Sequence, residues 1–331
     1  EIWHFNTILY QKLKNADIPV SHIFNESNLF ARIVNHLGSS KINHKVLQKI
    51  SEYKPDVVHL HTFMRDTKID KHLCQKWFFT LHSDMNRFLS QFNKNEIVNF
   101  SNQLSAGLQV VALTERAKQE VLAFNAKAQV IVIPNGIDIQ GIKSQKYDRA
   151  QLLKELKLPK DTFILGHVGR FNKVKNHEKL IQIFRCVLKK NPQAVLLLIG
   201  VGDKKERKRV HAIVDEYSLQ DKVKFLGVRK DATALMSCFD VMALPSYQES
   251  FSLVLVEAQA QGVRCVASDT VPDEVICCDN CFKLSINESD EKWAELLIGS
   301  TVRHDNIRSI YDFDINKVLA DTNNLYNEAL K

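Results

Sequence analysis

The sequence predicts an α/β protein made of two doubly wound, Rossmann-like domains. Three observations carry this prediction: short apolar strands, helical patterns between most of them, and a length of 331 residues. Strands that are apolar on both faces and alternate with helices are typical of parallel sheets covered on both sides. A chain of this length usually exceeds one domain, so we expect two such units.

Short apolar runs bounded by polar or turn residues indicate strands in both halves of the chain. The expected strands cover 56–61, 77–82, 108–113, 129–134, 163–169, 194–200, 223–227, 240–245 and 264–268. Apolar residues at helical spacing indicate helices in the intervals, among them 39–54 and 115–124, and a first helix at 2–14.

The expected domain boundary lies where Pro159 and Lys160 interrupt the pattern before a new strand begins. We expect a first domain at 1–158, a second at 159–314, and a last helix at 315–331 that packs on the second domain or back on the first. A doubly wound domain normally opens with a strand and a Gly-rich turn. The first domain shows neither, so we expect a leading segment that this sequence does not include.

Composition argues against several classes of protein. The chain is 45% hydrophobic and 25% charged, as in ordinary globular proteins, and no apolar run approaches the roughly 18 residues of a membrane-spanning helix. Seven scattered cysteines favour reduced thiols in a cytoplasmic setting over a disulfide framework. Cys278 and Cys281 form a CxxC pair beside Cys277, but no second ligand pair is visible, so we expect these thiols to be structural.

The positive charge is concentrated in the first half of the chain. Residues 1–150 hold 19 Lys and Arg against 13 Asp and Glu, and the net charge of the whole chain is +7. A basic domain suits an anionic membrane face or anionic substrates, although a solvated surface with extra lysines explains the count equally well. The run "KKERKR" (204–209) is expected to be a solvated helix face, and no nucleic-acid partner is expected.

A candidate anion site follows the strand expected at 163–169. The segment "GHVGRFNKVKNH" (166–177) leaves this strand and enters a helix. Gly169 permits a tight turn, and Arg170, Lys173 and Lys175 place three cations at the strand end. Cations beside a helix N-terminus form an anion site. A surface loop that is merely basic is the alternative. The later "GVGD" (200–203) is too short for a dinucleotide fingerprint and predicts a strand-to-helix turn.

A second candidate site is the segment "PSYQESFSLVLVEAQAQG" (245–262), which ends in an apolar helix. Ser252 is the expected N-cap and Gly262 the expected residue after the C-cap. Glu257 interrupts a helix that is apolar nearly all round, and no cation stands three or four residues from it. A buried carboxylate without a partner is costly, so a ligand is a candidate partner of Glu257.

The same segment offers groups that suit a nucleotide sugar. Backbone amides from Phe251 through Ser252 to Leu253 form the first helical turn and can face a phosphate. Glu257 can accept two hydrogen bonds from the vicinal diol of a ribose, and Glu249 can bind a sugar hydroxyl. Two acids, an anion-binding turn and a basic loop together predict a nucleotide-sugar site.

Three segments resemble the retaining GT-B glycosyltransferases of family four, particularly the branch that assembles exopolysaccharide and capsule. "ESFSLVLVE" (249–257) is similar to the E-x7-E motif of that family, "VGRFNKVKNHEKLI" (168–181) to its phosphate loop, and "VIPNGID" (132–138) to the end of its first domain. The likeness covers most of the chain and is strongest from 129 to 275. It implies the GT-B fold, in which two Rossmann-like domains face each other across a cleft.

The resemblance implies a role for each matched residue. Arg170 and Lys175 would hold the donor diphosphate and stabilise the leaving group. Glu257 would bind the ribose, and Glu249 would contact the donor sugar. His82, at the end of the strand expected at 77–82, matches a histidine that approaches the donor sugar; a hydrogen-bonded histidine at a strand end is the alternative.

The resemblance also implies the smaller site residues and the chemistry. Backbone amides near Gly169, Phe251, Ser252 and Leu253 would help to bind the donor. The donor is expected to be a UDP-sugar and the acceptor a glycan or lipid-linked glycan at the inner membrane face. No metal and no further cofactor are expected, because the cations can stabilise the charge that develops on the diphosphate. Retention of configuration is implied by the family, with the leaving phosphate as the base.

Other functions remain open at this point. The family places a Gly-rich loop after its first strand, and that loop is not in this sequence. A non-catalytic GT-B scaffold protein would explain its absence, although the presence of Arg170, Lys175 and Glu249 argues against this. A nucleotide-sugar epimerase or a phosphorylase on the same architecture is a further alternative. A dehydrogenase is disfavoured because GxGxxG follows none of the expected strands.

Overall fold

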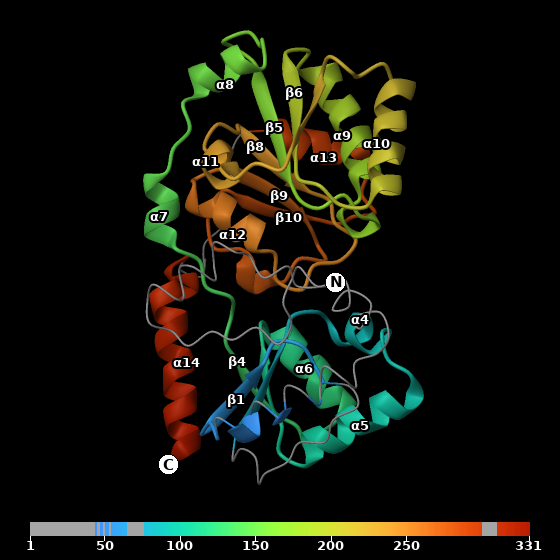
Figure 1. Cartoon of the computed structure of the whole chain (residues 1–331). Helices are drawn as coiled ribbons and strands as arrows, with labels where there is room; N and C mark the ends of the chain where they lie inside the picture. The colour runs from blue at the N-terminus through green and yellow to red at the C-terminus, as the bar shows by residue number, and fades with distance from the viewer. Residues whose placement is uncertain (1–43, 45–46, 49, 53, 65–75, 300–309) are drawn as a thin grey trace. The chain divides into compact units, whose positions relative to one another are not determined.

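The computed structural model describes residues 44, 47–48, 50–52, 54–64, 76–299 and 310–331. The helix expected at 2–14 and most of the one expected at 39–54 lie outside these residues. Contacts divide the described chain into two compact units (Figure 1). Unit 1 contains the described residues up to Ala112, together with Lys118–Ile131 and Tyr326–Lys331, and unit 2 contains Leu113–Ala117 and Val132–Leu325.

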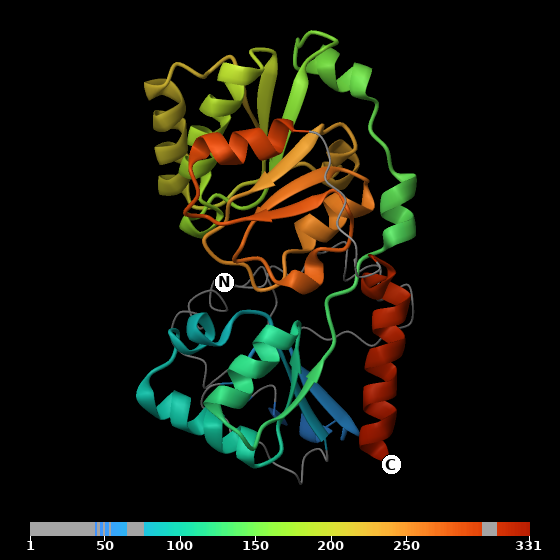
Figure 2. The ribbon, with the colours of Figure 1, turned by 180° about the vertical axis from the view of Figure 1, so that it is seen from behind.

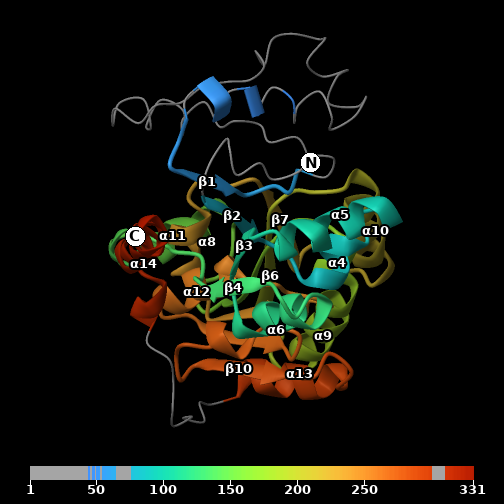
Figure 3. The ribbon, with the colours of Figure 1, turned by 90° about the horizontal axis from the view of Figure 1, so that it is seen from below.

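Unit 1 is built on a four-stranded sheet in the order β1-β2-β3-β4 (Figure 3). β1 pairs with β2, and β2 with β3, in parallel register. The strands are β1 (Val57–Leu60), β2 (Lys76–Leu81), β3 (Gln109–Ala112) and β4 (Gln129–Val132). The helices are α4 (Met85–Leu89), α5 (Lys94–Ser105) and α6 (Glu115–Phe124), which starts in the short segment assigned to unit 2. All four strands expected in this half are confirmed.

Neighbouring residues of β2 point to opposite faces of this sheet, as the pleat requires. Phe79 packs against Phe88 of α4 and Phe100 of α5. Phe78 instead packs against Tyr326, near the end of the last helix, α14 (Ile315–Leu330). α5 begins with a capping box: the Asn93 side chain accepts a hydrogen bond from the backbone N–H of Glu96, and the Glu96 side chain accepts one from the backbone N–H of Asn93. The end of α14 therefore covers the face of the sheet opposite to the helices.

Unit 2 is built on a six-stranded parallel sheet in the order β10-β9-β8-β5-β6-β7. The strands are β5 (Phe163–Val168), β6 (Ala194–Ile199), β7 (Val223–Gly227), β8 (Val241–Leu244), β9 (Arg264–Ser268) and β10 (Cys281–Leu284). The five strands expected in this half are confirmed, and β10 was missed because its sequence, "CFKL", is short and carries a lysine. The predicted fold class, two parallel-sheet α/β domains, is confirmed.

Helices cover both faces of this second sheet (Figure 2). One face packs against α9 (His177–Lys190), α10 (Lys204–Glu216) and α13 (Asp290–Ile298). The other face packs against α8 (Arg149–Glu155), α11 (Ala232–Met236) and α12 (Leu253–Ala260). Because both faces are covered, β6 and β8 are buried along their whole length, which explains their continuous apolar runs.

Residues 132–158, which we expected to end the first domain, are part of unit 2 instead. This stretch contains α7 (Ile139–Ser144) and α8. The side-chain amide Nε2 of Gln261 donates hydrogen bonds to the backbone carbonyl oxygens of Ile142 and Gln145, each over 2.9 Å. Leu152 of α8 is buried in the core of unit 2. The apolar side chains of α8 pack into the core of unit 2, so the two units divide at 131–132 and not at 158–159. The interruption of the sequence pattern at Pro159 does not reveal this packing.

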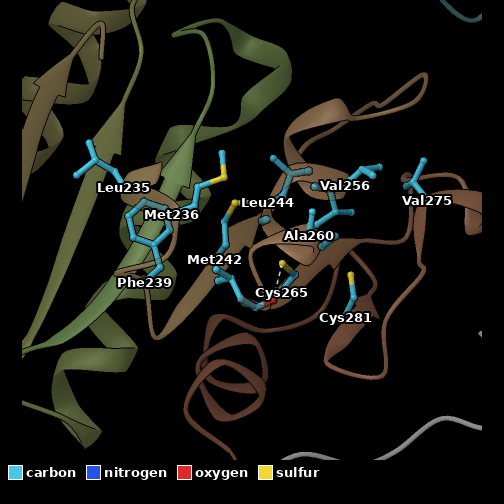
Figure 4. Packing of buried hydrophobic residues seen from close by; sticks show 14 of the residues in the cluster. Leu235, Met236, Phe239, Met242, Leu244, Val256, Ala260, Cys265, Val275 and Cys281 are labelled. Atoms are coloured by element: carbon cyan, nitrogen blue, oxygen red, sulfur yellow. Dashed lines mark hydrogen bonds between the residues drawn. The ribbon is translucent and has the colours of Figure 1, made fainter. Parts of the chain in front are cut away.

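The end of α12 confirms one local prediction. Gly262 takes a left-handed φ of +80°, its N–H donates to the carbonyl of Gln259 over 2.9 Å, and the N–H of Val263 donates to that of Ala258 over 3.0 Å. These two bonds form a Schellman motif. Val256 and Ala260 of α12 lie in the buried cluster of β8 and β9 side chains (Figure 4).

The cysteines of the described chain are free thiols, and most are buried in the core of unit 2. Cys265 and Cys281 are paired in register on β9 and β10. Within the described residues, no three His, Cys, Asp or Glu side chains are arranged to hold a metal ion. The same part of the chain also contains no helix that is both long and apolar enough to span a bilayer.

Candidate functional site

The candidate site lies where the strand order of unit 2 reverses. Strands β5, β6 and β7 run outward in one direction from this point, and β8, β9 and β10 run outward in the other. Ligands of open parallel sheets bind at the carboxyl ends of the strands beside such a switch point. The basic loop follows β5, and the segment "PSYQES" follows β8. The fold therefore brings both sequence-predicted segments to the same edge.

The basic loop is held against the strand end by close contacts between backbones. The N–H of Gly169 donates to the carbonyl of Ile199 over 2.9 Å, and the N–H of Phe171 donates to that of Val201 over 3.1 Å. A Cβ added to Gly200 would lie 2.1 Å from the carbonyl oxygen of Gly169, and one on Gly202 would lie 2.3 Å from that of Phe171. The "GVGD" segment therefore contains glycine because the basic loop packs directly on it.

Lys175 and Glu249 form an ion pair that joins the two loops. The Nζ atom of Lys175 lies 2.7 Å from Oε1 of Glu249, and the side chains are 16% and 9% exposed, so Lys175 is half-buried and Glu249 is buried. Lys175 ends a short 3-10 turn, η1 (Lys173–Lys175), in which the side chain of Asn172 accepts the Lys175 amide over 3.0 Å. The Tyr247 amide also donates to the carbonyl of Val174 over 2.8 Å.

The other two cations predicted for the basic loop are on the surface. Arg170 is exposed at the end of β5, and Lys173 is exposed on η1. Gly169 does not take a left-handed φ, so its role differs from the tight turn we expected. A Cβ at this position would lie 3.1 Å from Nε2 of His167 and 3.4 Å from the Lys175 side chain. Glycine is therefore favoured here by the lack of space.

Two buried histidines beneath the loop escaped the sequence analysis. His167 donates from Nδ1 to the carbonyl of Ala243 over 2.9 Å, and the ring of His177 stacks on Phe171 with 4.3 Å between centroids. Burial lowers the pKa of His167 well below its usual value, and burial followed by the charges of Lys175 and Arg209 lowers that of His177 to about 4. Both rings are therefore neutral at pH 7.

Nothing in the sequence marks these two histidines as buried. His167 stands in β5, whose four central residues are all buried, so no alternation of buried and exposed positions singles it out. Nε2 of His167 and both ring nitrogens of His177 are buried without a hydrogen-bond partner in the described structure. The rings of His167 and His177 are therefore buried, desolvated groups beneath the basic loop.

The start of α12 differs from the expected N-cap. Ser252 occupies the cap position, but its backbone is left-handed, with φ 73° and ψ 70°, and its side chain makes no capping bond. Its hydroxyl oxygen is buried without a partner in the described part of the chain. The predicted capping role of Ser252 is therefore wrong. A left-handed serine is strained, and such strain is often found at ligand-binding turns.

Replacing Ser252 by glycine is expected to raise the free energy of unfolding by about 1 kcal/mol. Glycine removes the cost of a left-handed side-chain residue and the buried unpaired hydroxyl, which together exceed the added entropy of the unfolded chain. Urea denaturation of the two proteins measures the difference. Ser237→Gly is the matched control, because Ser237 has a right-handed helical backbone and donates a hydrogen bond to Ala234, so this change should destabilise. Destabilisation by Ser252→Gly would contradict the strain argument.

The neighbours of Ser252 take different places in this turn. Phe251 is buried and packs edge-on against Phe313, with 5.4 Å between ring centroids. Leu253, the first residue of α12, is 39% exposed. The turn is thus anchored by Phe251 and reaches solvent at Leu253.

Glu257 lies one turn inside α12 and faces a cavity of about 300 Å³. The cavity is also lined by Asp138, Gly141 and Gln145, which lie in or next to α7, and by Thr233 of α11. Glu257 is half-buried, and burial raises the pKa of its carboxyl group. No side-chain hydrogen bond or ion pair of Glu257 is found within the described residues. Glu257 is thus a partly desolvated carboxylate that lines a cavity, and its binding of a ribose stays a prediction.

His82 lies in unit 1, directly after β2, and is exposed. Its Nε2 atom lies 3.0 Å from Nδ1 of His61, which follows β1. His61 falls at the end of the strand expected at 56–61 and carried no predicted role, because neighbouring parallel strands bring the two histidines together only in the folded sheet. The site residues thus divide into a group in unit 2 and a histidine cluster in unit 1.

The comparisons with known proteins agree with this architecture. Residues 148–298 match the family described as glycosyl transferases group 1, and residues 22–140 match Glycosyltransferase Family 4. The fold and the matched segments define a two-domain glycosyltransferase class. The chain belongs to the GT-B glycosyltransferases of family 4, group 1.

Several curated proteins are similar to parts of the chain. EpsF of Bacillus subtilis is 32% identical over 178 residues, which cover 52% of this chain and 44% of EpsF. N-acetyl-alpha-D-glucosaminyl L-malate synthase of Bacillus anthracis is 36% identical over 123 residues, covering 37% and 32% of the two chains. The chain thus spans less than half the length of these two relatives.

Solved structures resemble the whole described fold. Anabaena HepE in complex with UDP superposes with a TM-score of 0.71 at 20% identity, covering 97% of this chain and 89% of HepE. A glycosyltransferase from Rickettsia africae superposes with a TM-score of 0.68 at 19% identity, covering 98% and 88%. At this level of identity the likeness concerns the fold.

Proposed function

We propose that this protein is a retaining glycosyltransferase that moves a hexose from a UDP-sugar to a glycan or lipid-linked glycan acceptor during surface polysaccharide synthesis. The observation that carries the proposal is the ion pair of half-buried Lys175 and buried Glu249 at the switch point of unit 2. It places a cation and a carboxylate side by side where a sugar–phosphate bond can be held. A cation next to a carboxylate suits a nucleotide-sugar donor, because the lysine can bind the anionic diphosphate and the carboxylate can bind hydroxyl groups of the sugar.

Charge development explains the role of each group. Cleavage of the sugar–phosphate bond builds negative charge on the diphosphate and positive charge at the anomeric carbon. Lys175 and Arg170, with the amides at the start of α12, would stabilise the diphosphate, and Glu249 would bind a hydroxyl of the sugar. Preorganised cations in a desolvated site act more strongly than in water. Transfer without a metal ion or further cofactor is part of this proposal.

The cavity at Glu257 supports binding of a ribose. A half-buried carboxylate can accept one hydrogen bond from each hydroxyl of a 2′,3′-diol. These two bonds would replace the hydrogen bonds to water that the carboxylate loses through burial. The choice of UDP is supported by the bound UDP in HepE and by an Escherichia coli relative that is 27% identical over 143 residues, 43% of this chain and 37% of its own length. That relative is named a UDP-Gal:alpha-D-GlcNAc-diphosphoundecaprenol alpha-1,3-galactosyltransferase.

The remaining parts of the proposal concern the first domain. His82 would approach the donor sugar. The basic first half suits contact with an anionic membrane, and we place the protein in the cytoplasm at its inner face. Similarity to EpsF supports the exopolysaccharide and capsule branch.

Donor binding tests the proposal. UDP-, GDP- and ADP-sugars are titrated by calorimetry against the full-length protein, with nucleotide release and the anomeric configuration of the product followed by NMR. We expect one UDP-sugar to bind and be transferred with retention. Glu257→Ala should weaken binding about 10- to 100-fold, which is the loss expected for hydrogen bonds to a charged group.

Glu216→Ala is the matched control for Glu257→Ala, because Glu216 is exposed at the end of α10. Its donor affinity should equal that of the wild type. Binding without transfer to any acceptor would favour the scaffold alternative. Absence of binding of every nucleotide sugar would overturn the proposal.

A further inference from the structure

Three histidines gather at the carboxyl ends of β1 and β2 in unit 1. Nδ1 of His61 lies 3.0 Å from Nε2 of His82. The ring of His61 stacks on both neighbours, with centroid distances of 4.7 Å to His59 and 5.3 Å to His82. His61 therefore lies between the two other rings and contacts each of them.

His59 anchors this arrangement. Its Nδ1 lies 2.5 Å from the hydroxyl of Tyr326, and its Nε2 lies 2.7 Å from the hydroxyl of Thr80. Both ring nitrogens are occupied, so the plane of the ring is set by two partners on different elements. A ring stacked on His59 at an interplanar angle of 19°, as His61 is, inherits this orientation.

The contact between His61 and His82 joins two neutral rings at pH 7. Burial lowers the pKa of all three histidines, that of His59 to about 4, and the charge of a protonated neighbour lowers those of His59 and His82 further. Two neutral imidazoles 3.0 Å apart can bond only if one carries the proton at the contact and the other offers its lone pair. The pair therefore restricts the tautomer of each ring.

We propose that His61 is a positioning residue for His82, which it holds in one orientation and one tautomer. Free neutral histidine favours the Nε2–H form, so His82 donates from Nε2 to Nδ1 of His61. Its Nδ1 is then left as an acceptor for a substrate hydroxyl. The tautomer of a histidine is set by the hydrogen bond that its other nitrogen makes. This inference rests on the proposed function for the part that His82 plays in transfer.

Two replacements of His61 separate stacking from hydrogen bonding. His61→Phe keeps an aromatic ring against His59 but removes Nδ1. His61→Asn removes the ring but places an amide oxygen near the position of Nδ1, where it can accept from His82. A merely structural role predicts that the phenylalanine variant behaves better than the asparagine variant. A positioning role predicts the reverse.

The first readout is the tautomer of His82, measured by ¹⁵N NMR of the ring nitrogens in the full-length protein without substrate. We expect one tautomer, protonated on Nε2, in the wild type and in His61→Asn. His61→Phe should show a mixture of both tautomers. A single unchanged tautomer in His61→Phe would overturn the inference, whether or not the protein transfers sugar.

The second readout is steady-state transfer. His61→Phe should lower kcat about tenfold, the lower end of what outer-shell partners contribute, with a smaller change in the donor KM. His61→Asn should recover most of the loss, and His44→Asn, at an exposed position, should behave as the wild type. Equal kcat in His61→Phe and the wild type, with a reduced kcat in His82→Phe, would also overturn the inference. If the wild type transfers no sugar, the proposed function fails while the NMR result still decides the positioning of His82.

Discussion

Replacing Lys175 by methionine is expected to lower kcat for sugar transfer about 10²- to 10³-fold. Methionine keeps the apolar length of the side chain but removes the charge that would stabilise the leaving diphosphate. Removal of one preorganised group that acts on developing charge typically costs this much. Single-turnover release of nucleotide from a saturating donor measures the effect on the chemical step.

The same change should also reduce stability, because Glu249 is left buried without its cation. Breaking a buried pair by removing one partner costs about 3–5 kcal/mol. The double variant Lys175→Met/Glu249→Leu removes both charges and should recover most of this stability while remaining inactive. Recovery of activity in the double variant would contradict a catalytic role for the pair.

An exposed ion pair provides the control for this experiment. Lys190 and Glu295 lie 2.9 Å apart on the surface, with 43% and 61% of their side chains exposed. Lys190→Met should change the free energy of unfolding by less than about 1 kcal/mol, because solvent screens such pairs. Its transfer rate should equal that of the wild type. A comparable loss of activity in Lys190→Met would show that the effect at Lys175 is not specific to the site.

The second large effect is a loss of stability in mild acid that depends on His177. Its pKa is lowered from 6.5 to about 4, first by burial and then by Lys175 and Arg209. The unfolded chain therefore takes up this proton before the folded protein does. Stability is complete above pH 6.5 and falls as the pH drops toward 4.

The shift of His177 corresponds to about 3 kcal/mol when the pH has fallen to 4, of which about 2 kcal/mol is lost by pH 5. His177→Phe keeps a ring that can stack on Phe171 and cannot be protonated. Urea denaturation between pH 7 and pH 5 should show a shallower loss of stability in this variant. His59, whose pKa is also lowered to about 4, should maintain a residual slope.

His211→Phe is the matched control for His177→Phe, because His211 is exposed on α10. Its pH dependence should follow that of the wild type. If His177→Phe instead loses stability with pH as steeply as the wild type, the buried neutral state of His177 is wrong.

The fold was predictable because parallel strands buried on both faces leave continuous apolar runs in the sequence. Strands β6 and β8 are examples, since each is buried along its whole length. Strand β10 escaped because it is an edge strand of four residues with a lysine, and neither the run nor the alternation stands out. The division at 131–132 escaped because it depends on which core α8 packs into.

The candidate site was predictable where short-range chemistry decides it. Glu257 was singled out because no cation stands one helical turn away, and it does face a cavity. Ser252 was misjudged because capping preferences do not foresee a left-handed backbone at the start of α12. The histidines beneath the basic loop carry no local signal, because burial depends on residues distant in sequence.

The sequence by itself determined the parallel α/β class, the two cationic and carboxylate segments, and the family to which they belong. The fold class and the candidate segments follow from periodicity and spacing, which are local properties of the chain. The family follows from the resemblance of residues 132–138, 168–181 and 249–257 to its motifs. Only the tertiary structure decided that Lys175 meets Glu249 across 74 positions and that His61 meets His82 across 21. Such pairs form because parallel strands end at one edge of a sheet, and the order of strands in that sheet is set by the packing of the whole domain.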